Sequence, residues 1–476
     1  MKRIDNSTIN KIREIDVKKV SRDPFLAEMT INLLMNTVDK LYMEVCELNE
    51  EVQQLKNELT VLKGEKGKPR IKPSNKKDKD DDDNINPPQR KNRTKGSKKD
   101  KIKIDREEII KIDRSTLPED AEFKGYEEKI VQEILIKTDN VLYKREKYYS
   151  PSEHKTYTAE FPEGVEDTDF GPNLKALCAV LYFDYRITEN KIIKLLEEFG
   201  ITMSEGTLSN ILIKENAEIL SNEKSDIYDA GLKSTSYQQT DDTGFRVAGK
   251  NCYVQIVCNP YYSAYFINER KNRPTARKVI QNGSKKPVFD ILISDDAGQF
   301  DKITEERGLC WVHEYRHYKK IKSIFLKNIK LIEDFKSQIK QYYEKLKAYK
   351  ENPLENLKTE LTEEFDKLFG IKTGYDVLDE RIMQTKEKKA QLLTVLEHPE
   401  IPLHNNLSEN GLREVVVKRK ISSGTKTAEG STAWENYLTI SATCKKLGVN
   451  FFSYVKDIFS HKMELPRLAE LINQKA

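Results

Sequence analysis

Three short acidic segments contain the residues of this chain that could do chemistry. They surround Asp241, Asp295 and Glu409. The first two acids lie in or directly after apolar, β-branched or aromatic runs that predict strands, and the third opens a helix-like segment rich in basic residues. Carboxylates from distant segments are the hard oxygen ligands that hold two magnesium ions about 4 Å apart for phosphoryl transfer. A single Asp after a strand is more typical of a turn or a helix N-cap.

The surroundings of Asp241 and Asp295 predict one sheet. Four strands and one helix are expected, in the order Ser234–Val247, Tyr253–Cys258, Ser263–Ile267, the helix Pro274–Gln281 and the strand Pro287–Ser294. Hairpin strands, then a helix, then a parallel strand match the order of the ribonuclease H-like fold, an α+β arrangement with a mixed sheet. In that order, the first acid belongs midway along the first strand and the second just after the fourth. Asp241 and Asp295 occupy those places.

Each of these two acids has an acidic neighbour in the sequence, Asp242 and Asp296. Successive side chains of a strand point to opposite faces, so Asp241 and Asp242 cannot both face one site. The apolar residues around the first pair do not settle which of its members does.

A long helical segment separates the second acid from the third. Residues 313–400 are highly charged and nearly free of glycine, and they are too many for a loop, so they predict an inserted helical subdomain. Beyond them, the helix that begins near Glu409 is expected to pack through Leu412, Val415 and Val416. Basic residues follow, where a phosphate backbone would have to lie, namely Arg413, Lys418, Arg419 and Lys420. A solvated helix face explains these cations equally well.

Three short helices precede the sheet. Pro172 opens the first, Thr188 caps the second, which Gly200 closes, and Ser204 caps the third. Short connectors between three helices suit a helix-turn-helix that reads DNA. Small helical subdomains without that role share the pattern, so both interpretations stay open.

The N-terminal part carries a strict heptad repeat over residues 34–62. One position is always leucine and the other is mostly valine, as listed here: Leu34, Leu41, Leu48, Leu55 and Leu62, with Val38, Val45, Val52 and Leu59. β-Branched residues at a with leucine at d favour a parallel two-stranded coiled coil. An amphipathic helix docked on its own domain would use the looser 3.6-residue period.

These patterns divide the chain into seven segments. They are a helical and coiled-coil segment (1–62), a low-complexity charged linker (63–120), a small β ribbon (121–170), a helix-turn-helix-like unit (171–232), the first part of the catalytic core (233–312), the inserted helices (313–400), and the last part of the core with C-terminal helices (401–476). The expected fold class is therefore α+β and multidomain.

Composition excludes several classes of protein. With 476 residues, of which 37% are hydrophobic and 34% charged, the chain is too polar to be one compact core throughout. No apolar run approaches the ~20 residues of a membrane span, and the N-terminus lacks the apolar stretch of a secretory signal. Six scattered cysteines fit a reducing cytoplasm. The pair Cys310 and His313 has half of a zinc spacing without a second half nearby, so no structural zinc is expected.

Four blocks of the sequence resemble the large transposase of the insertion sequence 66 family, which carries an Asp-Asp-Glu active site. The blocks are Thr240–Gly244, Ile293–Asp296, Cys310–Arg316 and His404–Glu409, the last followed by Leu412-Arg413 and Arg419-Lys420. The family usually has Asp-Glu-Thr in the first block, Cys-Trp-Ala-His-x-Arg-Arg in the third and Asp-Asn-Asn-x-x-Glu-Arg-x-Leu-Arg in the last. The similarity extends from roughly residue 120 to residue 460, and the leucine heptad also fits the family.

The resemblance implies that Asp241, Asp295 and Glu409 are the catalytic residues and the ligands of Mg²⁺ or Mn²⁺. It selects the first acid of each neighbouring pair. It also implies a DNA transposase that binds the ends of an insertion sequence and catalyses strand cleavage and strand transfer. In the third block, His313 and Arg316 are expected to face DNA.

The resemblance also implies partners and a compartment. Double-stranded DNA at the element ends and at the target is expected, with self-association through residues 34–62 and small accessory proteins of the same element. The compartment would be the bacterial cytoplasm, near the nucleoid, with no membrane partner. Family members usually carry a cysteine-rich zinc element before the helix-turn-helix, but here Tyr148–Ser152 stands in its place.

Two departures from the family pattern lie beside the third acid. His404 replaces the usual Asp, and Asn410 replaces the usual Arg after Glu409. The alternative to an active transposase is a catalytically decayed DNA-binding regulator derived from one. A coiled-coil scaffold with no nucleic-acid role is the remaining interpretation.

Overall fold

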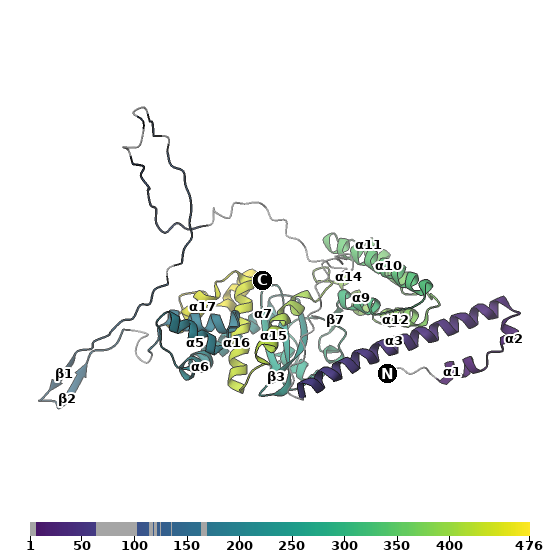
Figure 1. Ribbon diagram of the computed structural model, residues 1–476, viewed down its shortest axis with the longest axis horizontal. Helices are drawn as coiled ribbons and strands as arrows, with labels where there is room; N and C mark the ends of the chain where they lie inside the picture. Colours follow the sequence, from purple (N-terminus) through teal and green to yellow (C-terminus); the bar gives the residue numbers. More distant parts are fainter. Residues whose placement is uncertain are drawn as a thin grey trace.

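The computed structural model describes residues 6–62, 102–113, 118, 121–123, 125–134, 136–162 and 169–476. Most of the predicted linker, residues 63–120, lies outside these ranges. Figure 1 shows a central sheet, with one group of helices on one side of it and a second group on the other. Among the helices of the described ranges, none has the length and apolar character needed to cross a lipid bilayer.

The central sheet has five strands in the order β5-β4-β3-β6-β7. Their bounds are β3 Tyr237–Val247, β4 Lys250–Cys258, β5 Ser263–Asn268, β6 Ile291–Ser294 and β7 Glu306–Leu309. The first three pair antiparallel, and β6 and β7 run parallel to β3. Ala248 and Gly249 form the two-residue turn between β3 and β4, both with positive φ (49° and 79°), as in a type I′ hairpin. The four predicted strands are confirmed, although β6 begins at Ile291 rather than at Pro287, and β7 was not predicted.

The sheet separates two hydrophobic cores. In β6, Ile291 and Ile293 belong to the core beneath the inserted helices, whereas Leu292 belongs to the other core. Because side chains alternate along a strand, this short continuous apolar run serves both faces. All four residues of β6 are buried.

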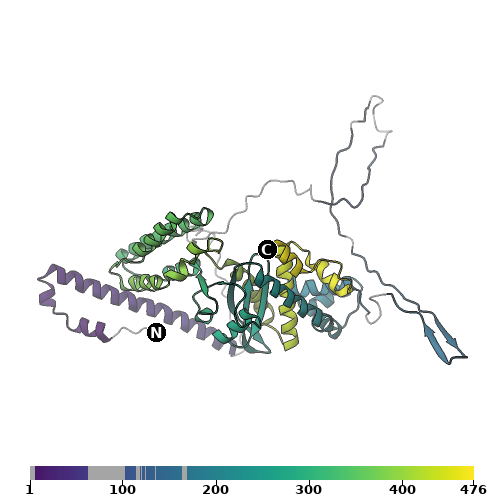
Figure 2. The same cartoon turned by 180° about the vertical axis from the view of Figure 1, so that it is seen from behind.

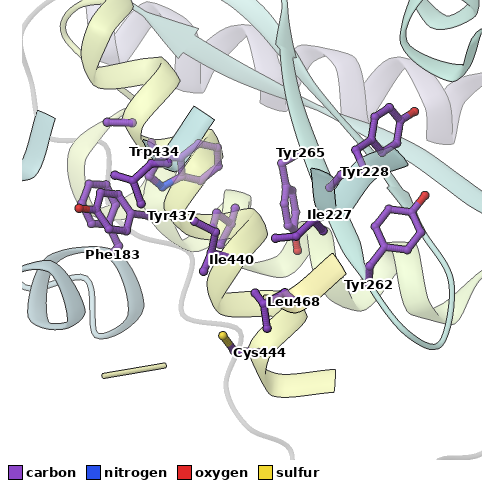
Figure 3. Packing of buried hydrophobic residues seen from close by; sticks show 14 of the residues in the cluster. Phe183, Ile227, Tyr228, Tyr262, Tyr265, Trp434, Tyr437, Ile440, Cys444 and Leu468 are labelled. Atoms are coloured by element: carbon purple, nitrogen blue, oxygen red, sulfur yellow. The ribbon is translucent and has the colours of Figure 1, made fainter. Parts of the chain in front are cut away.

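Helices that precede the sheet in the sequence share the larger core with helices that follow it. They are α4 Pro172–Ala179 with its π-helical continuation Val180–Asp184, α5 Glu189–Glu198, α6 Glu205–Ile213, α7 Ala217–Lys233, α16 Ala428–Leu447, α17 Phe451–Ser460 and α18 Leu468–Lys475. The three helices predicted before the sheet are confirmed, and Ser204 caps α6 by accepting a hydrogen bond from the Thr207 N–H. In Figure 3, Phe183 lies beside Trp434 and Tyr437 of α16. The helices α4–α6 therefore do not form a core separate from that of α16.

Helix α16 covers the open edge of the sheet. The outward backbone N–H groups of β5 donate to side chains of α16: Ser263 N to Thr443 Oγ1 at 3.4 Å, Tyr265 N to Thr439 Oγ1 at 3.2 Å, and Ile267 N to Glu435. Four helical residues rise about 6 Å and two strand residues about 6.7 Å, so one acceptor per turn meets every second strand residue. The edge is thereby closed to other strands.

The predicted insertion is helical and packs on the opposite face of the sheet. Its helices are α9 Trp311–Lys319, α10 Leu326–Glu351, α11 Glu355–Leu368, α12 Asp376–Glu387, α13 Lys389–Leu392 and α14 Thr394–Glu397. Trp311 is 1% exposed, contacts Tyr342 and Phe365, and donates from its indole to the Leu392 carbonyl at 2.9 Å. The aromatic core of the insertion thus begins at the residue that follows Cys310.

The N-terminal helix α3 (Pro24–Leu62) lies along the inserted helices, as Figure 2 shows from behind; α1 (Asn6–Arg13) and α2 (Val17–Val20) precede it. It docks through polar residues. Asp39, fully buried, accepts hydrogen bonds from Ser323 Oγ (2.6 Å), Ile324 N (3.2 Å) and Asn328 Nδ2 (2.9 Å). The predicted heptad positions from Leu34 to Leu59 are 36–57% exposed. The helix therefore contacts its own chain through the face opposite the heptad seam.

The predicted ribbon before the helices is present only in part. A hairpin joins β1 (Lys147–Ser150) to β2 (Lys155–Thr158), with Tyr148 opposite Tyr157. The described residues between 121 and 146 form no helix or strand. Apolar side chains of this segment are exposed, with Ile134 and Leu142 each 80% exposed, so alternation along the sequence did not produce a folded ribbon there.

Candidate active site

Asp241 and Asp295 lie on two neighbouring central strands. Asp241 is part of β3, and Asp295 directly follows β6. The two strands run parallel with Gln239 opposite Ile293. Two residues further along each strand, Asp241 and Asp295 therefore reach the same region at the carboxyl end of β6.

Helix α15 (Asn406–Ser422) brings Glu409 to this region in its first turn. The approach depends on Gly411, because a β-carbon there would overlap the side chain of Ile256 in β4 and lie 3.0 Å from the Tyr265 hydroxyl. The same hydroxyl donates to the Gly411 carbonyl at 3.4 Å. The missing side chain thus lets α15 rest directly on the sheet.

Asn405 joins the segments that carry Asp241 and Glu409 to the start of α9. It is fully buried, and its Nδ2 donates to the carbonyl of Thr240, the residue before Asp241, at 2.8 Å. Its backbone N–H donates to Cys310 Sγ at 3.2 Å, and its carbonyl accepts from the Glu409 N–H at 3.1 Å. The sequence blocks contained Asn405 but assigned it no role. The structure gives it the position of a tie between β3, the start of α9 and the start of α15.

Electrostatic interaction links the three acids. Burial, together with the nearby carboxylates of Asp295, Asp242 and Glu409, raises the pKa of Asp241 to about 7. Its Oδ1 accepts a 2.7 Å hydrogen bond from the Asp242 N–H, which opposes the shift. The three acids from separate segments therefore influence one another, and in the described chain no ion pair compensates the charges of Asp241 and Asp295.

The acids that follow Asp241 and Asp295 in the sequence differ from these two because each has a cationic partner. Asp242 pairs with Lys271 Nζ at 2.7 Å and accepts from Gln299 Nε2 at 2.7 Å. Asp296 pairs with Lys388 of the insertion. Sequence reasoning missed all three partners, because nothing in a local pattern indicates that Lys271, Gln299 and Lys388 meet these acids.

Glu409 is held by the third sequence block. Arg316 donates through Nη1 and Nη2 to its two carboxylate oxygens, at 3.2 and 3.1 Å. His313 Nδ1 lies 3.5 Å from Oε1, and burial lowers the pKa of His313, which favours its neutral form. The two residues predicted to face DNA therefore contact the third acid, although the side chain of Arg316 remains 47% exposed.

Cys310 offers a second potential metal ligand beside Glu409. Ligand atoms of Cys310, His313 and Glu409 lie within 4.8 Å of one another. A thiolate, an imidazole and a carboxylate suit zinc or a similar transition metal better than magnesium. However, burial raises the pKa of the Cys310 thiol to about 11, and its sulfur already accepts the N–H of Asn405. The arrangement therefore favours a structural role for Cys310 at the start of α9.

The basic residues predicted to contact DNA separate into exposed and buried members. Arg413 and Lys420 are exposed, and Arg419 donates to the Gly244 carbonyl of β3 at 2.6 Å. Lys418 differs from these three residues because it is buried. Lys418 is 8% exposed, lies 4.5 Å from the ring centre of Tyr182, and burial lowers its pKa to about 8. It faces the helical core because it follows Val415 by three residues and so lies on the same side of α15.

The carboxylates of Asp241 and Asp295 suit a divalent cation, whereas both oxygens of Glu409 accept hydrogen bonds from Arg316. In the described part of the chain, the carboxylate of Asp241 accepts a hydrogen bond only from the backbone N–H of Asp242. The carboxylate of Asp295 accepts one only from the backbone N–H of Ala297. Neither forms an ion pair there. Carboxylate oxygens are the preferred ligands of Mg²⁺ and suit Mn²⁺. A bound cation would also offset the repulsion that raises the pKa of Asp241.

Comparisons with known proteins agree with this geometry. A protein-family model described as "Transposase IS66 family" matches residues 168–433, which include all three acids and the third sequence block. The chain is also 38% identical over 167 residues to the uncharacterized protein y4jO of Sinorhizobium fredii (strain NBRC 101917 / NGR234). That match covers 35% of this chain and 51% of the relative, so the chain spans about half the length of the curated protein it matches.

Proposed function

Because the chain belongs to the IS66 family of transposases, we propose that it binds the ends of an insertion sequence, cleaves DNA strands there and transfers them to target DNA. The observation that supports this most directly is the convergence of Asp241, Asp295 and Glu409 from a strand, a strand end and a helix start. The acids lie on a rigid scaffold, which suits a site that must hold cations and DNA in fixed geometry.

The proposed fold of the core is ribonuclease H-like. Three antiparallel strands, a helix (α8, Arg273–Gln281) and two parallel strands follow one another along the chain, in the spatial order β5-β4-β3-β6-β7. The acids lie on the first strand, after the fourth, and on the helix that follows the insertion. These positions of the acids match the ribonuclease H-like order that was proposed from the sequence.

In the proposed reaction, Asp241, Asp295 and Glu409 hold Mg²⁺ or Mn²⁺. Two such ions stabilise the attacking and the leaving oxygen of a phosphoryl transfer. Asp241 and Asp295 approach from adjacent strands and Glu409 approaches from α15, so the chain offers oxygen ligands from more than one direction. Asn405 and Gly411 keep α15 against the sheet and so fix the position of Glu409.

Arg316 is proposed to change partners when the site is loaded. Its guanidinium occupies both oxygens of Glu409, which are the atoms that a cation needs. A cation bound to Glu409 would repel the guanidinium, so Arg316 would have to turn away from this carboxylate. Because its side chain is already half exposed, a DNA phosphate is the natural new partner. His313, Arg413, Arg419 and Lys420 are proposed to contact the same DNA.

We place dimerisation on the free face of α3. The docked residues Asn36, Asp39 and Lys40 lie at positions f, b and c of the heptad, opposite the a and d seam. The seam leaves leucine and valine exposed along the helix, which is the surface that a second copy would cover. Helix α6, in the helix-turn-helix-like unit, is proposed to contribute to recognition of the element ends.

Cleavage of end DNA tests the proposed function. Duplexes taken from the sequence that flanks the gene, incubated with the full chain and Mg²⁺ or Mn²⁺, should be cut at the element boundary, and EDTA should abolish cutting. A decayed regulator would bind the same duplexes without cutting them in either metal. A scaffold without a nucleic-acid role would not retard them at moderate salt.

A further inference from the structure

A run of basic residues surrounds helix α8, between the third strand and the second acid. Residues 270–286 include seven basic residues and no acidic one, and all seven side chains are exposed. We call these residues the α8 surface: Arg270, Lys271, Arg273, Arg277, Lys278, Lys285 and Lys286. A cluster of like charges destabilises itself unless something of opposite charge lies nearby.

The α8 surface has few anionic partners within the protein. Lys271 pairs with Asp242, Arg273 lies 3.7 Å from Asp301, and Lys286 lies 3.5 Å from the well-exposed Glu305. The other four cations have no acidic side chain within 4 Å in the described ranges, namely Arg270, Arg277, Lys278 and Lys285. The positive charge of this surface is therefore available to an external anion.

Helix α8 is held rigidly. Its own residues Ala276 and Ile280 are buried on the inner face of the helix. Arg273 Nη2 donates to the Gly298 carbonyl at 3.1 Å, and Arg277 Nη2 donates to the Lys302 carbonyl at 3.2 Å. Each of these contacts uses one guanidinium nitrogen and leaves others free. Arg273, Arg277 and Lys278 also line a hollow of about 350 Å³. Three of the seven cations of the α8 surface therefore lie around a concave part of the protein surface.

The α8 surface adjoins the candidate active site. Lys271 contacts Asp242, which neighbours the first acid, and Gln299 of the short helix Gly298–Phe300 donates to the same carboxylate. Helix α8 begins two residues after Lys271, with Asn272 as its N-cap. Its N-terminus, which favours anions, therefore lies at the edge of the site. A strand held at the three acids can continue directly onto α8.

We propose that the α8 surface binds the phosphate backbone of the duplex DNA whose strand occupies the active site. This inference rests on the proposed function and assigns the DNA a path that the family match does not give. Nine residues of α8 extend about 13.5 Å, a length over which duplex DNA carries about eight phosphates. Backbone contact requires charge and shape but no base sequence, which agrees with a surface made of lysine and arginine.

The test removes three charges that make no internal contact. The variant Arg270→Ala, Lys278→Ala, Lys285→Ala is compared with Lys330→Ala, Lys372→Ala, Lys386→Ala, which removes the same charge from exposed residues of the insertion. Fluorescence anisotropy measures the affinity of each full-length protein for a labelled end duplex over a range of salt concentrations. Each lost phosphate contact lowers the slope of log K against log salt by about 0.9, so the α8 variant should lose roughly two to three units.

The expected result is weaker binding of end and scrambled duplexes alike by the α8 variant, with a reduced salt slope, and an unchanged slope in the insertion control. The charge-conserving variant Arg270→Lys, Lys278→Arg, Lys285→Arg should keep the wild-type slope. An α8 variant with the wild-type slope and affinity would overturn the inference, and so would equal losses in both alanine variants. If the wild type still cuts end DNA in that case, the proposed function survives without this surface.

Discussion

At the residue scale, cationic partners distinguish Asp241 and Asp295 from the acids that follow them in the sequence. Asp242 and Asp296 lie against Lys271 and Lys388, whereas Asp241 has no such partner in the described chain. Sequence reasoning alone left the first pair unresolved, because strand alternation shows that two acids diverge but not which one faces the site. Lys388 lies between α12 and α13, and Lys271 lies in the loop before α8. No local sequence pattern predicts that these lysines contact Asp242 and Asp296.

The raised pKa of Asp241 predicts how the metal-free protein responds to pH. Its pKa is about 7 in the folded state and 3.8 in the reference state, so between these values the folded state binds more protons than the unfolded state. Stability in EDTA should therefore fall as pH rises from about 4 to about 7, by on the order of a few kcal/mol at most. Asp241→Asn cannot ionise, so thermal melts at pH 5 and pH 8 should differ less for this variant than for the wild type.

Asp242→Asn is the matched control for that experiment, because it removes the partner of Lys271 and leaves Asp241 intact. It should retain most of the wild-type pH dependence, because burial and Asp295 raise the pKa of Asp241 more than the Asp242 carboxylate does. Addition of Mg²⁺ at pH 8 should raise the melting temperature of the wild type and have little effect on Asp241→Asn. An identical pH dependence in wild type and Asp241→Asn would mean that Asp241 is not under strain from its neighbours.

The bidentate interaction between Arg316 and Glu409 predicts that loss of the Arg316 side chain has opposite effects on Mn²⁺ binding and on DNA cleavage. Arg316→Ala frees both oxygens of Glu409, so Mn²⁺ should bind the DNA-free protein more tightly, by roughly tenfold for a lost competing interaction of about 1.4 kcal/mol. Cleavage of end DNA should nevertheless fall, because a phosphate contact is lost. Isothermal titration with Mn²⁺ and a cleavage assay measure the two effects. Arg316→Lys should lie between wild type and alanine, and a parallel loss of both activities would show that Arg316 only maintains the fold.

At the element scale, local patterns predicted much of the sheet and the helices around it. Alternation, apolar runs and cap residues were sufficient to predict the strands β3, β4 and β5 and the starts of α5 and α6. The Ser204 side chain caps α6, whereas the Thr188 side chain makes no capping hydrogen bond to α5. Strand β7 was missed because Glu306–Leu309 is short and contains Gly308. The hydrogen bonds from β5 to α16 and the burial of Lys418 depend on tertiary packing between distant segments. Sequence periodicity carries no information about such contacts.

Gly411 gives the sharpest test of how α15 is positioned. Gly411→Ala should favour the helix by about 1 kcal/mol, but its β-carbon would overlap Ile256, at a cost of about 1–3 kcal/mol. Thermal melts should therefore show little gain or a loss, and cleavage should fall strongly because Glu409 is displaced. Gly206→Ala in α6 is the control, since its β-carbon would meet only Ser204 Oγ at 3.9 Å and should be neutral or stabilising.

A compensating change separates displacement of α15 from general damage. Ile256→Val removes the terminal methyl that the new β-carbon would meet, so Gly411→Ala with Ile256→Val should regain part of the stability and of the cleavage lost by Gly411→Ala. No recovery in the double variant, with normal behaviour of Gly206→Ala, would mean that close packing of α15 on β4 does not set the position of Glu409.

At the scale of the whole molecule, the two faces of α3 have different roles. One face is fixed to the insertion through Asp39 and its neighbours, and the heptad seam is exposed. Leu41→Lys with Leu48→Lys should therefore convert a dimer into a monomer, as measured by light scattering, because charges in the seam cannot be buried. Glu47→Lys with Glu50→Lys changes positions outside the seam and should leave the dimer intact. An unchanged mass for the leucine variant would place self-association elsewhere.

The central claim is that Asp241, Asp295 and Glu409 together form the catalytic site. The most direct measurement compares cleavage of one end duplex in Mg²⁺ by six full-length proteins, the wild type and the alanine variants of these three acids and of Asp242 and Asp296. We expect each variant of the three acids to lose at least about a thousandfold in rate, equivalent to about 4 kcal/mol, with duplex affinity nearly unchanged. Asp242→Ala and Asp296→Ala should retain substantial activity. Normal cleavage by Glu409→Ala, together with loss of cleavage in Asp242→Ala, would contradict the account.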